Sequence, residues 1–409
     1  MRKPTTWISD LALWLALVTI TLCGAASVPG ADRVGWRGDG SGCYPSAVPV
    51  TRWSATEHVL WKSEIGTGHS SPVVVGRRVL ITAEPDLLLC LDAETGQPLW
   101  RKTHVFADQA THADAKNLKR SSEYGDTTPT PVSDGQRVWV FIGTGIVGCY
   151  DTDGTRRWSR WYDLPQSTTY GRTASPVLIG DRLLVHFGPL VCLDAASGRP
   201  LWTNQTAKAS YGTPAPVRIG DVDVVITPKG QIVRVADGRT LATDLGNCMY
   251  TSPVVQNGTV YFIDGDMVAV RLPEKAADTI ECRELWAASL PGDFYASPVI
   301  QGERIHTMDK AAKYYVIDAH TGKTLLNQQL ELTPAARRDS AHVYPSLCLA
   351  GKHLFASNDA GDTMLLDPGE DATPVAVNRL PGGSGGTPAF SGKRLFIRSG
   401  KLLYCIGEK

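Results

Sequence analysis

Short apolar runs alternate with turn residues along most of the chain. In many places an apolar run is followed by a glycine turn, as in Val75-Gly76-Arg77 and Ile179-Gly180-Asp181, and then by a second apolar run. Short runs bounded in this way are typical of β-strands, because glycine accepts positive φ and aspartate bonds its own turn backbone. The pattern therefore predicts an all-β chain built of hairpins.

A proline signal recurs along the chain and reveals an internal repeat. Each copy places a proline at the start of a predicted strand, where it removes no ladder hydrogen bond. The copies are Ser71-Pro72-Val73, Thr130-Pro131-Val132, Ser175-Pro176-Val177, Ala215-Pro216-Val217, Ser252-Pro253-Val254, Ser297-Pro298-Val299 and Thr387-Pro388-Ala389, with a degenerate copy at Tyr344-Pro345-Ser346. Their mean spacing is about 45 residues, the length of one four-stranded propeller blade.

The end of each unit repeats as well. Closing strands are predicted to begin at Trp61, Trp100, Trp158, Trp202, Leu241, Trp286, Leu325 and Val375. The first of them precedes any complete unit, while the last unit runs out of chain. We therefore expect Leu60-Trp61-Lys62 to supply the outer strand of the C-terminal blade, which leaves no open sheet edge. The predicted fold is an eight-bladed β-propeller of four-stranded blades, closed by an N-terminal strand.

The closing units resemble a known repeat. The form Leu-Asp-Ala-x-Thr-Gly-x-x-x-Trp, preceded by Ser-Pro-Val, is similar to the tryptophan-docking repeat of pyrroloquinoline-quinone (PQQ) dehydrogenases and of the propeller lipoprotein that assists outer-membrane protein assembly. The resemblance covers residues 57–409, and Trp36-Arg37-Gly38 further resembles exported quinoprotein-like propellers of planctomycete bacteria. It implies that tryptophans lock neighbouring blades together. The residues that match this blade-docking role are Trp100, Trp158, Trp202, Trp286, Gly96, Gly198 and Gly322.

The resemblance leaves two functions open. Enzymes of this kind bind PQQ with calcium, place two adjacent cysteines against the cofactor, and oxidise alcohols or sugars. This sequence has no adjacent cysteine pair, and a repeat that docks blades says nothing of redox chemistry. We expect a non-catalytic scaffold that binds a protein, peptide or small ligand, without cofactor or metal. A PQQ- and calcium-dependent dehydrogenase is the alternative.

Polar and aromatic residues recur three positions before the strand-starting prolines. In a propeller these positions surround one mouth of the central channel, where convergent polar groups favour a ligand pocket. Packing of the same side chains between blades is the competing interpretation. The candidate ligand-binding residues are His69, Tyr250, Tyr295 and His342 at this position, with Arg172, Tyr170 and Tyr211 nearby.

Charge and the N-terminus bear on partners and location. Acidic and basic residues balance at 41 each, so the chain has no basic field for nucleic acid. A charged start, a short apolar run and small residues predict a signal peptide over 1–26, followed by an extension over 27–56 and the propeller over 57–409. We expect an exported monomer without a transmembrane segment, in the periplasm or cell envelope, bound to an envelope protein or peptide. A lipid anchor at Cys23 is less favoured because Leu22 is large.

The remaining cysteines form two groups. Four stand in or near repeated core positions and are predicted to pack as small hydrophobic residues: Cys90, Cys149, Cys192 and Cys405. The other four fall outside the pattern and could form disulfides in an oxidising compartment: Cys43, Cys248, Cys282 and Cys348. The sequence does not fix a connectivity.

The longest insertion in the repeat spans 103–129. It contains His104 and His112, whose spacing does not suit a metal site. Lys116 and other charged residues accompany them, so a solvated loop that caps one face is predicted.

Overall fold

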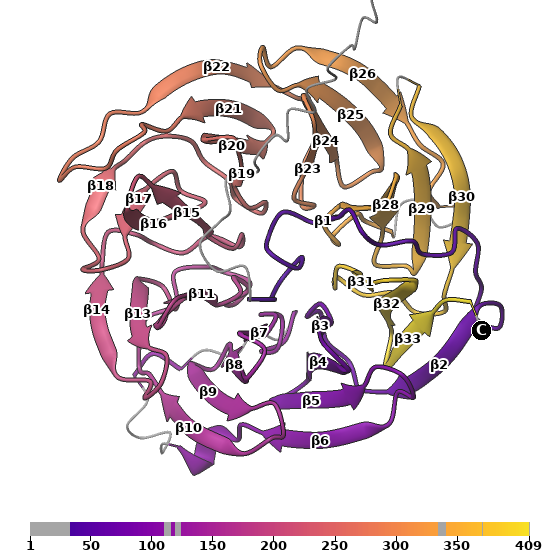
Figure 1. Cartoon of the computed structure of the whole chain (residues 1–409), viewed down its shortest axis with the longest axis horizontal. Helices are drawn as coiled ribbons and strands as arrows, with labels where there is room; N and C mark the ends of the chain where they lie inside the picture. Colours follow the sequence, from indigo (N-terminus) through magenta and orange to yellow (C-terminus); the bar gives the residue numbers. More distant parts are fainter. Residues whose placement is uncertain (1–32, 110–115, 119–123, 334–340, 370, 409) are drawn as a thin grey trace, which may run out of the picture.

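Eight four-stranded sheets stand side by side around a central axis (Figure 1). The computed structural model describes residues 33–109, 116–118, 124–333, 341–369 and 371–408. This arrangement confirms the predicted all-β, eight-bladed propeller. Within the described residues, the single helical element is the short 3-10 turn η1 (Phe106–Asp108). No helix there has the length and hydropathy that a membrane span would need.

The first four blades follow the chain, each from its innermost to its outermost strand. They are β3 (Val73–Val75), β4 (Arg78–Ala83), β5 (Leu87–Asp92) and β6 (Pro98–Thr103); β7 (Val132–Ser133), β8 (Arg137–Ile142), β9 (Ile146–Asp151) and β10 (Arg156–Trp161); β11 (Val177–Ile179), β12 (Arg182–His186), β13 (Leu190–Asp194) and β14 (Pro200–Asn204); β15 (Ala215–Ile219), β16 (Val222–Ile226), β17 (Ile232–Arg234) and β18 (Thr240–Ala242).

The next three blades continue in the same order. They are β19 (Val254–Gln256), β20 (Thr259–Asp264), β21 (Asp266–Arg271) and β22 (Arg283–Ser289); β23 (Val299–Gln301), β24 (Arg304–Met308), β25 (Lys313–Asp318) and β26 (Thr324–Gln329); β27 (Cys348–Ala350), β28 (His353–Ser357), β29 (Asp362–Asp367) and β30 (Thr373–Arg379). The seventh of these blades gains a fifth strand, β1 (Cys43–Tyr44), which pairs in parallel with β27.

The eighth blade joins the two ends of the chain. Its inner strands are β31 (Ala389–Ser391), β32 (Arg394–Ser399) and β33 (Leu402–Ile406), and its outer strand is β2 (Val59–Glu64). β2 pairs antiparallel with β33, with Trp61 opposite Cys405. The predicted closure by an N-terminal strand is therefore confirmed.

The hydrophobic core lies between neighbouring blades. One cluster joins Trp139 and Phe141 of the second blade to Leu183 and Val185 of the third. At the outer strands, tryptophan side chains extend this packing to the next blade. The Nε1 atoms of Trp61, Trp100, Trp158, Trp202 and Trp286 each donate to a backbone carbonyl of the following blade, at 2.9 to 3.0 Å.

A turn glycine of the following blade packs beneath each of these indoles. A Cβ on Gly96 would lie 2.5 Å from the Trp61 ring, and one on Gly198 would lie 2.6 Å from Trp158. Gly322 meets Trp286 in the same way. These positions also have φ near +72°, so glycine is required both for space and for backbone conformation.

The cysteines and the start of the insertion correct two expectations. All eight described cysteines are free, including Cys43 and Cys348. His104 is buried rather than solvated, because it lies between the carbonyl of Asp86 and the hydroxyl of Tyr150. Phe106 packs edge-on against Trp161. The first part of the insertion thus belongs to the core, whereas His112 lies outside the described residues.

Candidate functional site at the channel mouth

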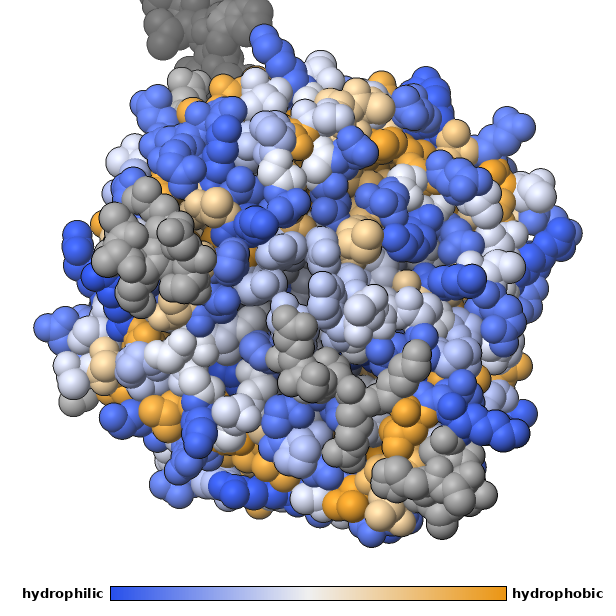
Figure 2. Space-filling view, turned by 180° about the vertical axis from the view of Figure 1, so that it is seen from behind, coloured by the Kyte–Doolittle hydropathy of each residue, from blue (hydrophilic) through white to orange (hydrophobic). Residues whose placement is uncertain are grey.

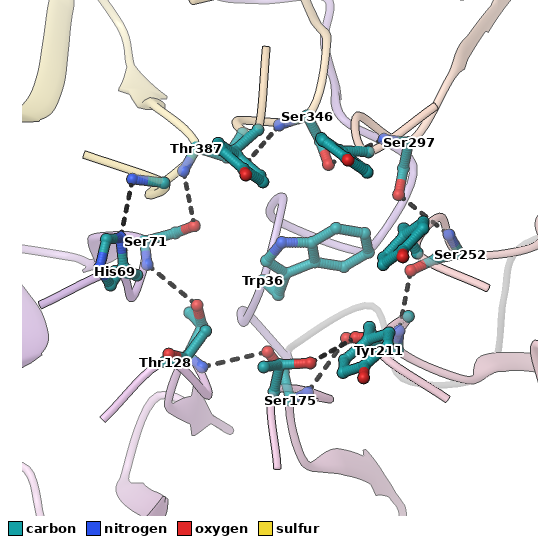
Figure 3. Close-up of a pocket in the computed structure, with 18 of the residues that line it drawn as sticks. Trp36, His69, Ser71, Thr128, Ser175, Tyr211, Ser252, Ser297, Ser346 and Thr387 are labelled. Atoms are coloured by element: carbon teal, nitrogen blue, oxygen red, sulfur yellow. Dashed lines mark hydrogen bonds between the residues drawn. The ribbon is translucent and has the colours of Figure 1, made fainter. Parts of the chain in front are cut away.

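Eight hydroxyl-bearing residues form a closed ring around the channel axis. In each blade the backbone N–H of one serine or threonine donates to the side-chain oxygen of the equivalent residue in the next blade, at 2.8 to 3.1 Å. We call this set the hydroxyl ring (Figure 3). Its members are Ser71, Thr130, Ser175, Thr213, Ser252, Ser297, Ser346 and Thr387.

The hydroxyl ring corrects the predicted register in two blades. Thr213 belongs to the ring, so Pro214 rather than Pro216 is the equivalent of Pro72. In the seventh blade the ring residue is Ser346, which follows Pro345. The position two residues before the ring therefore holds Tyr211 and Tyr344. Counting back from Pro216 and Pro345 instead points to Thr213 and to the predicted His342.

Six tyrosines form a second circuit at the mouth. The rings of Tyr124, Tyr170, Tyr211, Tyr250, Tyr295 and Tyr344 contact one another in sequence and back to the first, with centroid separations of 4.8 to 6.3 Å. We call this set the tyrosine circle. Five members come from segments that lead into inner strands, and Tyr124 comes from the long insertion. Such offset and edge-on ring contacts stabilise a rigid aromatic rim.

The N-terminal segment closes the other end of the channel. It crosses the face seen in Figure 1 from the axis to the rim before it becomes β2. Val34 forms a β-bridge with Ser133. The next turn places the indole of Trp36 in the middle of the hydroxyl ring, with the flat face of the indole toward the viewer (Figure 3). Trp36 therefore forms the floor of a cup that opens at the tyrosine circle.

Arg37 fixes this floor from behind. Its side chain is buried, and Nη2 donates to the carbonyls of Ser41, Pro298 and Leu347 at 2.7 to 3.0 Å. The guanidinium carbon also lies 5.2 Å from the Trp36 ring centroid, a cation–π distance. One face of the indole is thus already occupied by a cation.

The cup encloses a cavity of about 280 Å³. The face opposite the N-terminal segment is hollowed at its centre (Figure 2). Among the described residues that line the cavity, Asp359 is the one acid, and lysine and arginine do not occur. His69 also lines it, and its Nδ1 accepts a hydrogen bond from Gly385 N–H at 3.1 Å. The imidazole proton is therefore on Nε2, where it can donate.

Burial governs the ionisable groups of the cup. It lowers the pKa of His69, and the nearby Arg398 guanidinium lowers it further. Burial also raises the pKa of Tyr250 and Tyr295, and with the Tyr124 hydroxyl raises that of Tyr344. The histidine and these three tyrosines are consequently uncharged near neutral pH, so they present hydroxyl and ring N–H donors beside the single acid Asp359.

The structure brings most of the predicted site residues together. His69, Tyr170, Tyr211, Tyr250 and Tyr295 line the cavity. His342 stands behind Tyr344, at a centroid separation of 5.8 Å, and is not among the lining residues.

Arg172 binds backbone carbonyls behind the cup and does not line the cavity. Its Nε and Nη1 donate to the carbonyls of Phe187 and Gly143 at 2.7 and 2.8 Å, and Nη2 donates to Leu164. Burial lowers the pKa of Arg172 to about 10, so it stays charged at neutral pH. The guanidinium ties together the loops behind the tyrosine circle instead of facing a ligand.

Several residues of the cup escaped the sequence analysis. Most members of the hydroxyl ring are the serine or threonine that directly precedes a repeated proline, so the sequence does contain them. Their hydrogen bonds run between blades, however, and appear only in the assembled propeller. Tyr344 was missed through the register displacement. Trp36 and Tyr124 lie far from the repeated positions in sequence, and no local pattern places them at the axis.

The cavity does not suit PQQ with calcium. That cofactor is a tricarboxylate, and the described lining residues offer it no lysine or arginine, while Asp359 would repel it. Calcium needs several oxygen ligands, yet the described residues contain no cluster of three or more acidic, histidine or cysteine side chains arranged for a metal. The predicted alternative therefore has no support in the residues of the cup.

Comparison with known proteins identifies the relatives of this chain. The family model described as "Outer membrane protein assembly factor BamB" matches residues 49–277. The chain belongs to this family. BamB of Moranella endobia is 24% identical over 378 residues, which cover 83% of this chain and 87% of the relative. BamB of Yersinia pestis is 23% identical over 299 residues, which cover 66% and 70%.

Solved structures agree on the fold. BamB from Moraxella catarrhalis superposes with a TM-score of 0.60 at 12% identity, covering 86% of this chain and 97% of that one. A europium-containing methanol dehydrogenase reaches 0.58 at 12% identity, covering 89% of each chain. At 12% identity, this structural similarity shows only that the proteins share the propeller fold. Family membership confirms the predicted repeat, and the BamB sequence relatives carry the name of an assembly factor, which agrees with the predicted scaffold rather than with a dehydrogenase.

Proposed function

We propose that this chain is an exported scaffold that binds another envelope protein on the face carrying the tyrosine circle. Membership of the BamB family supports a role in outer-membrane protein assembly. The tyrosine circle is the observation that carries the choice of face. Tyrosine is enriched in protein interfaces because it provides a large contact area at low entropic cost together with a polar hydroxyl.

The construction of the mouth favours binding over catalysis. The hydroxyl ring and the docked tryptophans hold the rim of the cup in place, so little ordering entropy is lost when a partner binds. The predicted signal peptide at 1–26 would deliver the chain to the envelope, and it lies outside the described residues.

Site-specific photocrosslinking in cells tests the face. A photoreactive residue at Tyr170, which is 41% exposed, should capture a specific envelope protein. The matched control is position 48 on the opposite face, where Val48 is 69% exposed and its N–H donates to the carbonyl of Gly392 in a β31–β32 turn. Equal capture at both positions, or none at Tyr170, would contradict the proposal.

A further inference from the structure

The hydroxyl ring has unused hydrogen-bond donors. Each ring oxygen accepts one backbone N–H, yet within the described residues no protein acceptor is recorded for any of the eight hydroxyl hydrogens. Seven of the eight residues are at most 5% exposed. Buried polar groups normally find partners. The ring therefore calls for a guest that carries several acceptors around its circumference.

The Trp36 indole at the floor of the cup favours a guest that also has an apolar face. Trp36 lies across the axis, inside the hydroxyl ring, with its indole face toward the cavity (Figure 3). Flat aromatic surfaces hold ligands that present C–H groups or a planar apolar face. A guest in this cup therefore contacts an aromatic plane below, hydroxyl groups around its edge, and phenol rings above.

Charge decides between candidate guests. An anion would find neither lysine nor arginine among the described lining residues, and it would meet Asp359. An organic cation would stack on an indole whose other face already contacts the Arg37 guanidinium at 5.2 Å, and it would offer the ring donors no acceptor. A neutral guest avoids both costs, because it brings no charge out of water.

We propose that the cup binds one neutral sugar ring, stacked on Trp36 and hydrogen-bonded by the hydroxyl ring. This assignment deepens the proposed binding function and rests on it for the face concerned. A pyranose has C–H groups on its ring face and oxygen acceptors around its edge. The cavity of about 280 Å³ is just below the range of about 300–1,000 Å³ typical of small-molecule pockets, which suits one ring. Because Trp36 closes the cup, a glycan would enter by its terminal residue.

Calorimetric titration of the purified exported chain tests the proposal. The probes are methyl glycosides of a neutral hexose and of an N-acetylhexosamine, with tetramethylammonium and a methyl uronoside as charged comparisons. Saturable binding of a neutral glycoside, at least ten-fold tighter than either charged probe, is the expected result. An oligosaccharide ending in the preferred sugar should bind within a few-fold of the free glycoside if the source is a glycan end, and not bind if only free sugar fits.

Variants locate the binding. Trp36→Ala should weaken the glycoside at least ten-fold, while Trp36→Phe keeps an aromatic face and should stay within a few-fold. Circular dichroism and thermal unfolding establish that both variants are folded. His320→Gln is a second control, because His320 is exposed and is not among the residues that line the cavity. Tyr250→Phe tests the rim.

Three results would overturn the assignment. They are the absence of saturable binding by any neutral sugar, tighter binding of a charged probe, and sugar binding that Trp36→Ala leaves unchanged. Photocrosslinking at Tyr170 reads out protein docking separately, so a failed sugar titration with intact crosslinking rejects the guest and keeps the scaffold. Lost crosslinking with intact sugar binding rejects protein docking on this face and keeps the sugar site.

Discussion

At the scale of single residues, the docking glycines are set by two requirements that act together. Gly96 has φ +71°, and a Cβ there would lie 2.5 Å from Trp61 and 2.7 Å from the Oγ of Ser63. Gly76 has φ +56° but open space around it. Comparing alanine at the two positions separates the cost of crowding from the cost of backbone strain.

We predict that Gly96→Ala destabilises the propeller by about 2–4 kcal/mol, since it adds a steric clash to left-handed backbone strain. Gly76→Ala should cost only about 1–2 kcal/mol, the strain alone. Chemical denaturation midpoints of the two variants provide the measurement. Equal losses would show that the indole contact is not what selects glycine.

Three buried histidines make stability depend on pH. Burial lowers the pKa of His104, His186 and His306 to about 4, against an ordinary value of about 6.5. The folded protein therefore binds fewer protons than the unfolded chain between these values. The stabilisation is complete above about pH 6.5 and is lost as the pH falls toward 4.

The contribution of one site can be measured by substitution. His104→Gln should be less stable than the natural protein at pH 7.5, because the pair with Tyr150 is disturbed, and it should lose less further stability between pH 7 and pH 4.5. His320→Gln is the control, because its side chain is 67% exposed. Thermal unfolding across this pH range reads out the slope. Identical slopes for His104→Gln and the natural protein would refute the assignment.

At the scale of elements, the strands were predictable and their register was not. Turn residues and closing tryptophans fix where hairpins lie, so all eight blades and the displaced β2 follow from local patterns. In most blades the proline directly follows the ring residue. Pro216 and Pro345 misled because each lies two residues away from that place in its own blade, which Pro214 and Leu347 occupy. The register is set by hydrogen bonds between neighbouring blades, and a pattern within one repeat does not reveal them.

Strand β2 should matter more to stability than its place before the first blade suggests. Trp61 is 9% exposed, packs against Phe396 at a centroid separation of 5.9 Å, and donates to Ala93 in the first blade. Trp61→Ala should therefore cost about 3–5 kcal/mol, as for a large core side chain. Leu99→Ala on the outer strand β6, where Leu99 is 49% exposed, should cost under about 1 kcal/mol. Matching unfolding midpoints for the two variants would show that β2 does not lock the ring.

At the scale of the whole molecule, the hydroxyl ring makes the eight blades interdependent. Each N–H donor and its acceptor belong to different blades, and the bond from Thr387 to Ser71 closes the circuit between the last blade and the first. The same molecule uses the N-terminal segment to fill one end of the channel, so the cup requires both the ring and the residues that precede it. Neither feature exists in an isolated repeat.

Alanine substitution around the ring tests whether this circuit acts as a unit. Ser297→Ala would leave the buried Ser252 N–H without its acceptor, and Ser71→Ala would do the same to Thr387. An unsatisfied buried donor costs about 1–3 kcal/mol, so both variants should lose that amount although they lie in different blades. Ser→Thr at the same positions should cost less, because threonine already serves at three points of the ring. Unfolding midpoints give the losses. A loss confined to Ser71, at the junction of first and last blades, would mean that only closure is sensitive and that the inner circuit does not couple the other blades.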